Sequence, residues 1–301
     1  MILIKEKSHF KKHEGLVAIL FILPSFIGFA VFFLIPVLSS FVLSFAKWNL
    51  SSFKNIQFIG LTNYFNILTE DLFTSSMKNS LIFTVSTVVI GISLSLVLAY
   101  FISRLVFFKG FMKIMFFMPY ISSTVAVSIV WMLLLQPKFG PINQFLRSIG
   151  VTNPPTWLAS VKWALPALIA MYIWQNLGYN IIIYIAGLSA VSHELYEAAE
   201  IDGANGIKKF FSITIPMVSP TTFFLVIMGI INSFKVFDQV QVLTQGGPGT
   251  ATTTLALYIY TEAFQFYKMG YASAAAWIMF IIIFIVTIVQ WRGQKKWVTY
   301  E

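Results

Sequence analysis

The chain has 301 residues, of which 58% are hydrophobic and only 10% are charged, and its mean hydropathy is +0.81. Soluble globular proteins carry about 25% charged residues, so this composition excludes a soluble domain and indicates an integral membrane protein. A net charge of +9 would also suit a nucleic-acid-binding protein, but basic loops that orient membrane helices are the simpler explanation. The chain has no cysteine, which excludes disulfides and thiolate metal sites.

Six apolar segments are long enough to cross a bilayer, which requires roughly 20 residues. The first follows four lysines as in a signal peptide, but it exceeds the roughly 7–15 apolar residues of a signal sequence, so we expect it to be retained. The expected spans cover residues 16–40, 79–103, 114–135, 163–187, 212–234 and 270–291. The sequence therefore predicts an all-α membrane protein with one six-helix domain, residues 16–291, between a tail at 1–15 and a tail at 292–301.

Basic residues are unevenly distributed between the two sets of loops. Twelve lysines and arginines fall in segments 1–15, 104–113, 188–211 and 292–301, whereas eight fall in the longer segments 41–78, 136–162 and 235–269. Cytoplasmic loops are enriched in these residues, so we expect both termini and the 188–211 loop to be cytoplasmic.

The loops between spans are polar or rich in turn-forming residues. Segment 136–162 contains four prolines and two glycines, which predicts a loop with one short helix around 141–149. Deep inside the spans there are no acidic or basic residues, and the three histidines lie outside them. Proton-coupled carriers usually need such residues, so proton-driven transport is disfavoured, whereas sodium coupling through backbone carbonyls stays open.

Uncharged polar residues gather in the fourth and fifth spans. Amides can hydrogen-bond the hydroxyls of a sugar and aromatic rings can cover its apolar faces, so these residues are candidates for a substrate pathway. Hydrogen bonding between helices is the alternative for each of them. The candidates are Trp174, Gln175, Asn176, Tyr179, Asn180, Tyr184, Asn232, Ser233 and, just beyond the fifth span, Asp238.

The 188–211 loop holds four of the eleven acidic residues within nine positions. Ser192 is a suitable N-cap for a short helix, and Gly203 is suited to a left-handed C′ position at its end. A second short helix is expected from about Asn205 to Ile215. The like charges are either tolerated on a solvated loop or used to contact a partner, and their spacing alone leaves both readings open.

The same loop resembles the EAA loop of binding-protein-dependent ABC importer permeases. That pattern is Glu-Ala-Ala, three residues, Gly, nine residues, then Ile, one residue and Leu-Pro, with Ile215 here in place of the leucine. Asp202 and Ala204 match the longer form seen in sugar permeases. The matching residues are Glu197, Ala198, Ala199, Asp202, Gly203, Ala204, Ile213 and Pro216.

A second segment, from Phe237 to Tyr260 with Gly246, Gly247, Pro248 and Gly249 at a tight turn, looks like the outer loop of carbohydrate-uptake permeases of the maltose and glycerol-phosphate type. It lacks the lysine of a nucleotide-binding loop. The resemblance extends over essentially the whole chain and implies a type I importer permease fold with cytoplasmic coupling helices in the cell membrane.

The resemblance also implies the partners. Glu197 would contact a cytoplasmic ATPase dimer, Ala198 and Ala199 would fit its cleft, and Gly203 would allow the turn between the two coupling helices. ATP and magnesium would be used by that ATPase, with no cofactor, metal or nucleic acid bound by this chain. A second homologous permease and an extracytoplasmic sugar-binding protein would complete the importer, with segments 41–78 and 235–269 as the docking surface.

Two other functions compete with a carbohydrate importer permease. An ion-coupled secondary carrier or channel would work without ATP. A membrane-embedded enzyme would need a nucleophile–base pair or a metal-ligand set, and the spans contain neither. The uncharged spans favour a neutral saccharide, while Lys235 keeps a phosphorylated polyol open.

Overall fold

The computed structural model describes residues 7–49, 56–104 and 107–299, without the side chains of 7–14 and 16. Residues 1–6 of the expected N-terminal tail, residues 50–55 of the 41–78 segment, residues 105–106 and the last two residues lie outside that description. One small hairpin is the only strand pairing among the described residues, which are otherwise helices joined by turns and loops. Its strands β1 (Ala46–Lys47) and β2 (Gln57–Phe58) pair antiparallel, with Ala46 opposite Phe58.

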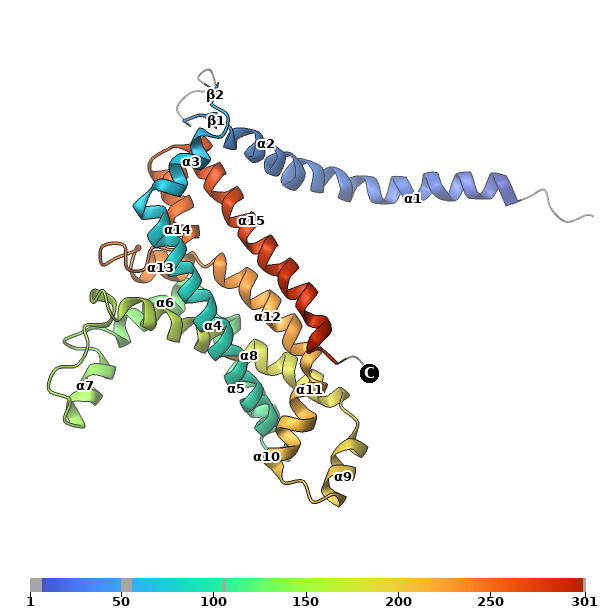
Figure 1. The fold of residues 1–301 in the computed structure, drawn as a ribbon, viewed down its shortest axis with the longest axis vertical. Coiled ribbons are helices and arrows are strands. Elements are labelled where there is room, and N and C mark those ends of the chain that lie inside the picture. Colours follow the sequence, from blue (N-terminus) through green and yellow to red (C-terminus); the bar gives the residue numbers. More distant parts are fainter. Residues whose placement is uncertain (1–6, 50–55, 105–106, 300–301) are drawn as a thin grey trace, which may run out of the picture.

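Within the described part of the chain, four helices are long and apolar enough to cross a membrane (Figure 1). The first consists of α1 (Lys7–Phe29), a π-helical turn at Ala30–Leu34 and α2 (Ile35–Ser44). The others are α4 (Asp71–Arg104), α8 (Ala164–Ala190) and α15 (Met269–Gly293). They overlap the first, second, fourth and sixth segments that the sequence marks as spans.

The segment expected to form the third span is a pair of helices bent by 97°. It contains α5 (Lys109–Ile121) and α6 (Thr124–Leu134). The break falls at Ser122, whose backbone is extended and whose Oγ donates to the carbonyl of Met118, 2.9 Å away. A side chain that bonds a carbonyl one turn back competes with the helical hydrogen bond, and this favours a helix end there.

The segment expected to form the fifth span is bent by 65°. Residues Gly206–Met217, which include α10 (Gly206–Lys209), a π-helical turn (Phe210–Thr214) and α11 (Ile215–Met217), precede α12 (Ser219–Phe234). Pro220 has no N–H for the carbonyl of Pro216 and its ring crowds that group, so the helix cannot continue straight. The hydroxyl of Ser219 donates to the same carbonyl, 2.6 Å away, which satisfies it at the bend.

The remaining elements are short. They are α3 (Thr62–Thr69), α7 (Pro141–Ser148), a 3₁₀ turn (Trp157–Ala159), α9 (His193–Ile201), α13 (Asp238–Leu243), α14 (Leu255–Tyr260), a π-helical turn (Thr261–Gln265) and a last 3₁₀ turn (Gln294–Lys296). Helix α7 confirms the short helix expected around 141–149. In Figure 1, α9 and α10 lie at one end of the molecule, and the β hairpin lies at the other.

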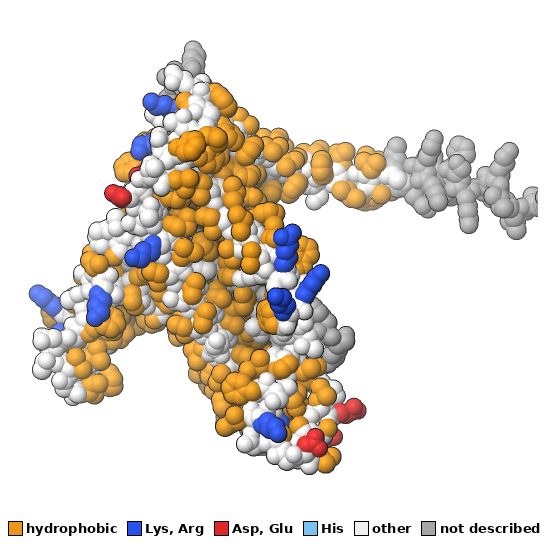
Figure 2. All heavy atoms as spheres, viewed as in Figure 1, with side chains coloured by type: hydrophobic (Ala, Val, Ile, Leu, Met, Phe, Trp, Pro, Cys, Tyr) orange, Lys and Arg blue, Asp and Glu red, His pale blue; other side chains and the backbone are white. Residues whose placement is uncertain are grey.

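The core lies where α4, α8 and α12 pack together, around fully buried side chains such as Ile181, Leu225 and Tyr184. In contrast, α1 and α2 extend away from the bundle, and none of the most apolar 18-residue window of Val17–Ser44 is buried. Apolar side chains cover much of the exterior (Figure 2), as expected of a protein whose solvent is lipid.

Candidate functional site

The 188–211 loop folds as two short helices. The Oγ of Ser192 accepts a hydrogen bond from the N–H of Glu194, 3.2 Å away, and α9 begins there, as the sequence predicts. Helix α10 begins at Asn205, whose Oδ1 accepts from the N–H of Lys208, 2.8 Å away. Both helices thus start with a side chain that satisfies a free backbone donor.

The turn between these helices depends on Gly203. Its φ is +75°, the left-handed conformation expected for a C′ residue. The N–H of Gly203 bonds the carbonyl of Glu200 (3.0 Å), and the N–H of Ala204 bonds the carbonyl of Ala199 (2.8 Å). These are the two hydrogen bonds of a Schellman motif, which reverses the chain immediately after α9.

Two side-chain contacts join α9 to the segment that follows the turn at Gly203. The ammonium group of Lys209, which is only 8% exposed, forms an ion pair with Glu200. The hydroxyl of Tyr196 lies 2.9 Å from Oγ1 of Thr214, which is fully buried. Both contacts therefore connect α9 to the segment that leads to α12.

The Lys209 ammonium also acts on the acidity of its partner. Its hydrogen bond and positive charge hold the pKa of the Glu200 carboxyl below its usual value. A carboxyl with a lowered pKa stabilises the folded state above its usual pKa, near 4.3, and this contribution disappears as the pH falls through the lowered value. The ion pair should therefore persist at pH 5.

Removing the Glu200 carboxylate should make local opening of the α9–α10 loop more frequent. In Glu200→Gln, Lys209 stays buried without a counter-charge, so we expect amide hydrogen exchange at Gly203 and Ala204 to accelerate roughly two- to fivefold at pH 7, a modest factor because Glu200 is exposed. Exchange mass spectrometry in detergent measures this. Glu194→Gln, in the first turn of the same helix and outside that ion pair, is the control. Equal rates in both variants would contradict a role for the ion pair.

The remaining surface of the loop faces away from the bundle. Acidic side chains gather at its end of the molecule (Figure 2). Glu197 is 65% exposed and pairs with His193 at 3.1 Å, while Ile201 and Ile207 are 87% and 71% exposed. Of the other residues in the motif, Ala198, Asp202 and Gly203 are exposed, whereas Ala199, Ala204, Ile213 and Pro216 are half-buried. Carboxylates mixed with exposed isoleucines suit a protein interface.

Two adjoining cavities, of about 190 and 110 Å³, lie between α4, α5, α6, α8, α12 and α13, and we call them together the central pocket. Tyr120, Tyr172 and Asn176 line both cavities. Six of the expected pathway residues meet there, although they come from three different helices. These are Gln175, Asn176, Tyr179, Asn180, Asn232 and Asp238.

Amides and aromatic rings dominate the polar chemistry of the pocket. Gln239 donates to Gln175 (2.7 Å), and Gln175 donates to Thr124 (3.4 Å), so one chain of hydrogen bonds joins α13, α8 and α6. The rings of Tyr120 and Tyr179 are stacked, with their centroids 4.9 Å apart. The oppositely charged Lys235 and Asp238 also line the pocket. This arrangement can bind an uncharged, hydroxyl-rich molecule.

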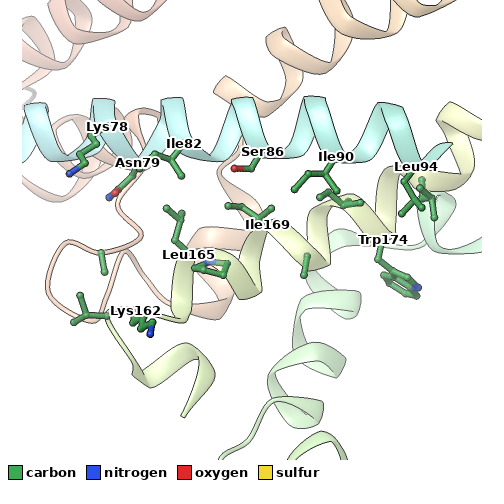
Figure 3. A pocket seen from close by; sticks show the side chains of 16 residues that line it. Lys78, Asn79, Ile82, Ser86, Ile90, Leu94, Lys162, Leu165, Ile169 and Trp174 are labelled. Atoms are coloured by element: carbon green, nitrogen blue, oxygen red, sulfur yellow. The ribbon is translucent and has the colours of Figure 1, made fainter. Parts of the chain in front are cut away.

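Three expected pathway residues lie elsewhere. Tyr184 is fully buried and donates to Thr222 (3.0 Å), and Ser233 is fully buried and donates to Thr84 (3.0 Å), so both join helices together. Trp174 points away from the central pocket. It lines an external groove of about 920 Å³ between α4 and α8 (Figure 3) and contacts the ring of Trp131.

The external groove is apolar along most of its length. Ile82, Ser86, Ile90 and Leu94 follow one face of α4 at four-residue spacing, opposite Leu165 and Ile169 of α8 (Figure 3). Lys78 and Lys162 lie at one end. The groove therefore differs in chemistry from the central pocket.

Sequence reasoning missed part of the central pocket. Tyr172 precedes Asn176 by one helical turn, so its place on the same face of α8 could have been inferred. The other missed residues come from helices whose packing the sequence does not reveal. The polar residues among them are Thr87, Tyr120, Thr124 and Gln239.

A membrane-spanning helical bundle with a polar pocket between its helices and a charged loop at one end is the architecture of a transport protein. The chain belongs to the family of binding-protein-dependent transport system inner membrane components, whose family model matches residues 88–295. It is thus a multi-pass permease subunit of an ABC importer, a transport subunit rather than an enzyme.

Three relatives are similar in sequence to this chain over most of their length. A probable ABC transporter permease of Bacillus subtilis, YesP, is 32% identical, with 98% of this chain and 96% of the relative covered. The sn-glycerol-3-phosphate permease UgpA of Agrobacterium fabrum is 33% identical (81% and 83% covered), and the lactose permease LacF of Rhizobium radiobacter is 32% identical (96% and 98% covered).

The fold is also similar to that of a solved structure. A chain of a bacterial alginate ABC transporter, crystallised in complex with an alginate pentasaccharide-bound periplasmic protein, matches with a TM-score of 0.84. The two chains are 23% identical, and the match covers 97% of this chain and 98% of the other. The helical arrangement described above is therefore that of an ABC importer permease.

Proposed function

We propose that this permease translocates a neutral saccharide or oligosaccharide that an extracytoplasmic binding protein delivers. The observation that carries the proposal is the central pocket, where amides and stacked tyrosines meet between apolar helices. Lys235 and Asp238 together contribute no net charge, which favours a neutral ligand over a phosphorylated polyol. Relatives named for lactose and arabinooligosaccharide transport support a neutral saccharide, whereas a third is named for sn-glycerol 3-phosphate transport.

The transport domain would have six spans, with both termini in the cytoplasm. Four described helices are long and apolar enough to cross a membrane, and counting each of the two bent pairs as one span would bring the number to six, which supports this proposal. The excess of lysine and arginine on the side of the 188–211 loop supports the orientation. Segments 41–78 and 235–269 would then face the binding protein.

The 188–211 loop would be the coupling element for a cytoplasmic ATPase dimer. Its exposed carboxylates and isoleucines form the surface, and its contacts at Lys209 and Tyr196 connect that surface to α12. ATP and Mg²⁺ would be bound by the ATPase, so this chain needs no cofactor of its own.

A second permease would pack beside this one. Helix α1 and the π-helical turn that joins it to α2 leave their apolar side chains uncovered, as with Phe21 and Phe32, which are 82% and 83% exposed. Lipid can cover such a surface, but a helix that departs from its own bundle also suits packing on a neighbouring subunit. We expect a heterodimer of homologous permeases.

The proposal is tested with the complete importer in proteoliposomes, assembled from both permeases, the ATPase and the binding protein. Lactose, arabinotriose, maltotriose and sn-glycerol 3-phosphate serve as probes. We expect a neutral saccharide, loaded on the binding protein, to raise ATP hydrolysis several-fold. Stimulation by glycerol 3-phosphate alone would contradict a neutral substrate. Uptake by this chain alone, driven by an ion gradient, would favour a secondary carrier.

A further inference from the structure

Two buried glutamines share one wall of the central pocket. Gln175 on α8 is 4% exposed, and Gln239 on α13 is 3% exposed. They are joined by a 2.7 Å hydrogen bond, and Gln175 continues to Thr124 on α6. Both side chains line the 190 Å³ cavity. This pair thus holds the amide group of Gln239 in a fixed position at the pocket.

One polar atom of Gln239 is left without a partner. Among the residues that the structure describes, nothing hydrogen-bonds its Oε1, although this oxygen is shielded from water. Buried side-chain acceptors are nearly always satisfied, and an unsatisfied one destabilises the fold. A hydrogen-bond acceptor that lacks a donor at the wall of a binding pocket suggests that a ligand supplies the donor.

The chemistry of the missing partner follows from the amide network. In the orientation that the structure gives, the Nε2 of Gln239 donates to Gln175, and the Oε1 of Gln239 has no donor. If both amides were reversed, Thr124 would donate to Gln175, Gln175 would donate to Gln239, and the Nε2 of Gln239 would lack an acceptor. A hydroxyl satisfies either arrangement because it donates and accepts. A phosphate or carboxylate oxygen only accepts, and an ammonium group only donates.

Each of the two cavities is smaller than an ordinary ligand site, which encloses roughly 300–1,000 Å³; they measure about 190 and 110 Å³. An oligosaccharide would require the pocket to widen, and widening would also give the ligand access to the shielded atom of Gln239.

We propose that Gln239, positioned by Gln175, is a specificity-determining residue that hydrogen-bonds one hydroxyl of the transported saccharide. This inference rests on the proposed function and adds a particular contact to it. Gln175 is a positioning residue, because its own amide is already satisfied by Gln239 and Thr124.

The test compares a saccharide with its monodeoxy analogues. The complete importer in proteoliposomes is first given the four probes named above, and uptake of the transported probe is then measured against each of its monodeoxy forms. We expect the wild type to transport one deoxy form at least about tenfold more slowly than the parent sugar, since a site built for a hydroxyl rejects its absence.

Gln239→Met keeps the length of the side chain and removes its polar atoms. We expect this variant to lose about tenfold in uptake of the parent sugar and to transport parent and deoxy form within about twofold of each other, because the contact that distinguished them is gone. If the Gln239→Met variant does not accumulate in membranes, Gln239→Leu replaces it in the same test. Gln241→Met, on the same helix but outside both cavities, is the matched control and should keep the wild-type preference.

The outcomes separate the inference from the proposed function. If the wild type transports none of the three saccharides, both are rejected. If it transports one of them, and Gln239→Met or Gln239→Leu keeps the wild-type preference over every deoxy form, only the role of Gln239 is rejected. Loss of the preference at Gln239 with retention at Gln241 is the result that supports it.

Discussion

Gly203→Pro is expected to abolish substrate-stimulated ATP hydrolysis while leaving the permease inserted in the membrane. Gly203 has a φ of +75°, and proline is restricted to about −65°. Proline also lacks the N–H that bonds the carbonyl of Glu200. The turn after α9 therefore cannot form, and the exposed surface around Glu197 is no longer held in place relative to α10 and α12. ATPase activity of the reconstituted complex, with and without loaded binding protein, measures the effect.

Gly206→Ala is the matched control for this variant. Gly206 lies three residues further along the same loop, its φ is not positive, and a Cβ placed there would meet no described atom within 4 Å. We expect wild-type stimulation in the control. Normal transport by Gly203→Pro would show that the loop does not couple ATP hydrolysis to the permease.

Gly178→Ala is expected to cost about 3 kcal/mol of stability, the upper end for overpacking, and to reduce uptake below a tenth of the wild-type rate. Gly178 lies on α8, where the helix meets the backbone of α5. A Cβ there would overlap the carbonyl group of Phe116 and approach Cα of Phe117 to 2.7 Å. Backbone atoms cannot rotate away, so α5 and α8 would have to separate, which would also part Tyr120 from Tyr179.

The Gly178 prediction is measured by thermal unfolding in detergent and by uptake in proteoliposomes. Gly110→Ala, on α5, is the control, because a Cβ at that position meets no described atom within 4 Å. Alanine is also the better helix former, so this control should be at least as stable as the wild type. An unchanged melting temperature for Gly178→Ala would contradict the close approach of the two helices.

The fold of the 188–211 loop was predictable because its determinants are local. Ser192 and Gly203 cap the same nine-residue helix, and a cap requires only a few neighbouring residues. Long apolar runs such as Asp71–Arg104 were equally visible, since hydropathy requires no knowledge of packing. The bends were not predicted, although Pro220 and Ser122 mark them, because a hydropathy window averages over such single residues.

The central pocket could be predicted only in part. The amides of α8 were conspicuous in an apolar span, but Tyr120 and Gln239 become pocket residues only when α5 and α13 pack against α8. Conversely, Tyr184 and Ser233 look like pathway residues in the sequence and instead bond Thr222 and Thr84 within the core. Periodicity assigns a residue to a face of a helix, but it does not say which neighbour covers that face.

The central claim is that ATP hydrolysis by a partner drives a saccharide through this chain. The most direct measurement is uptake of labelled saccharide into proteoliposomes that hold the complete importer, with ionophores present to collapse all ion gradients. We predict accumulation above equilibrium that requires ATP on the side of the 188–211 loop and stops in Gly203→Pro. Accumulation that persists without ATP, or that the ionophores abolish, would contradict the account.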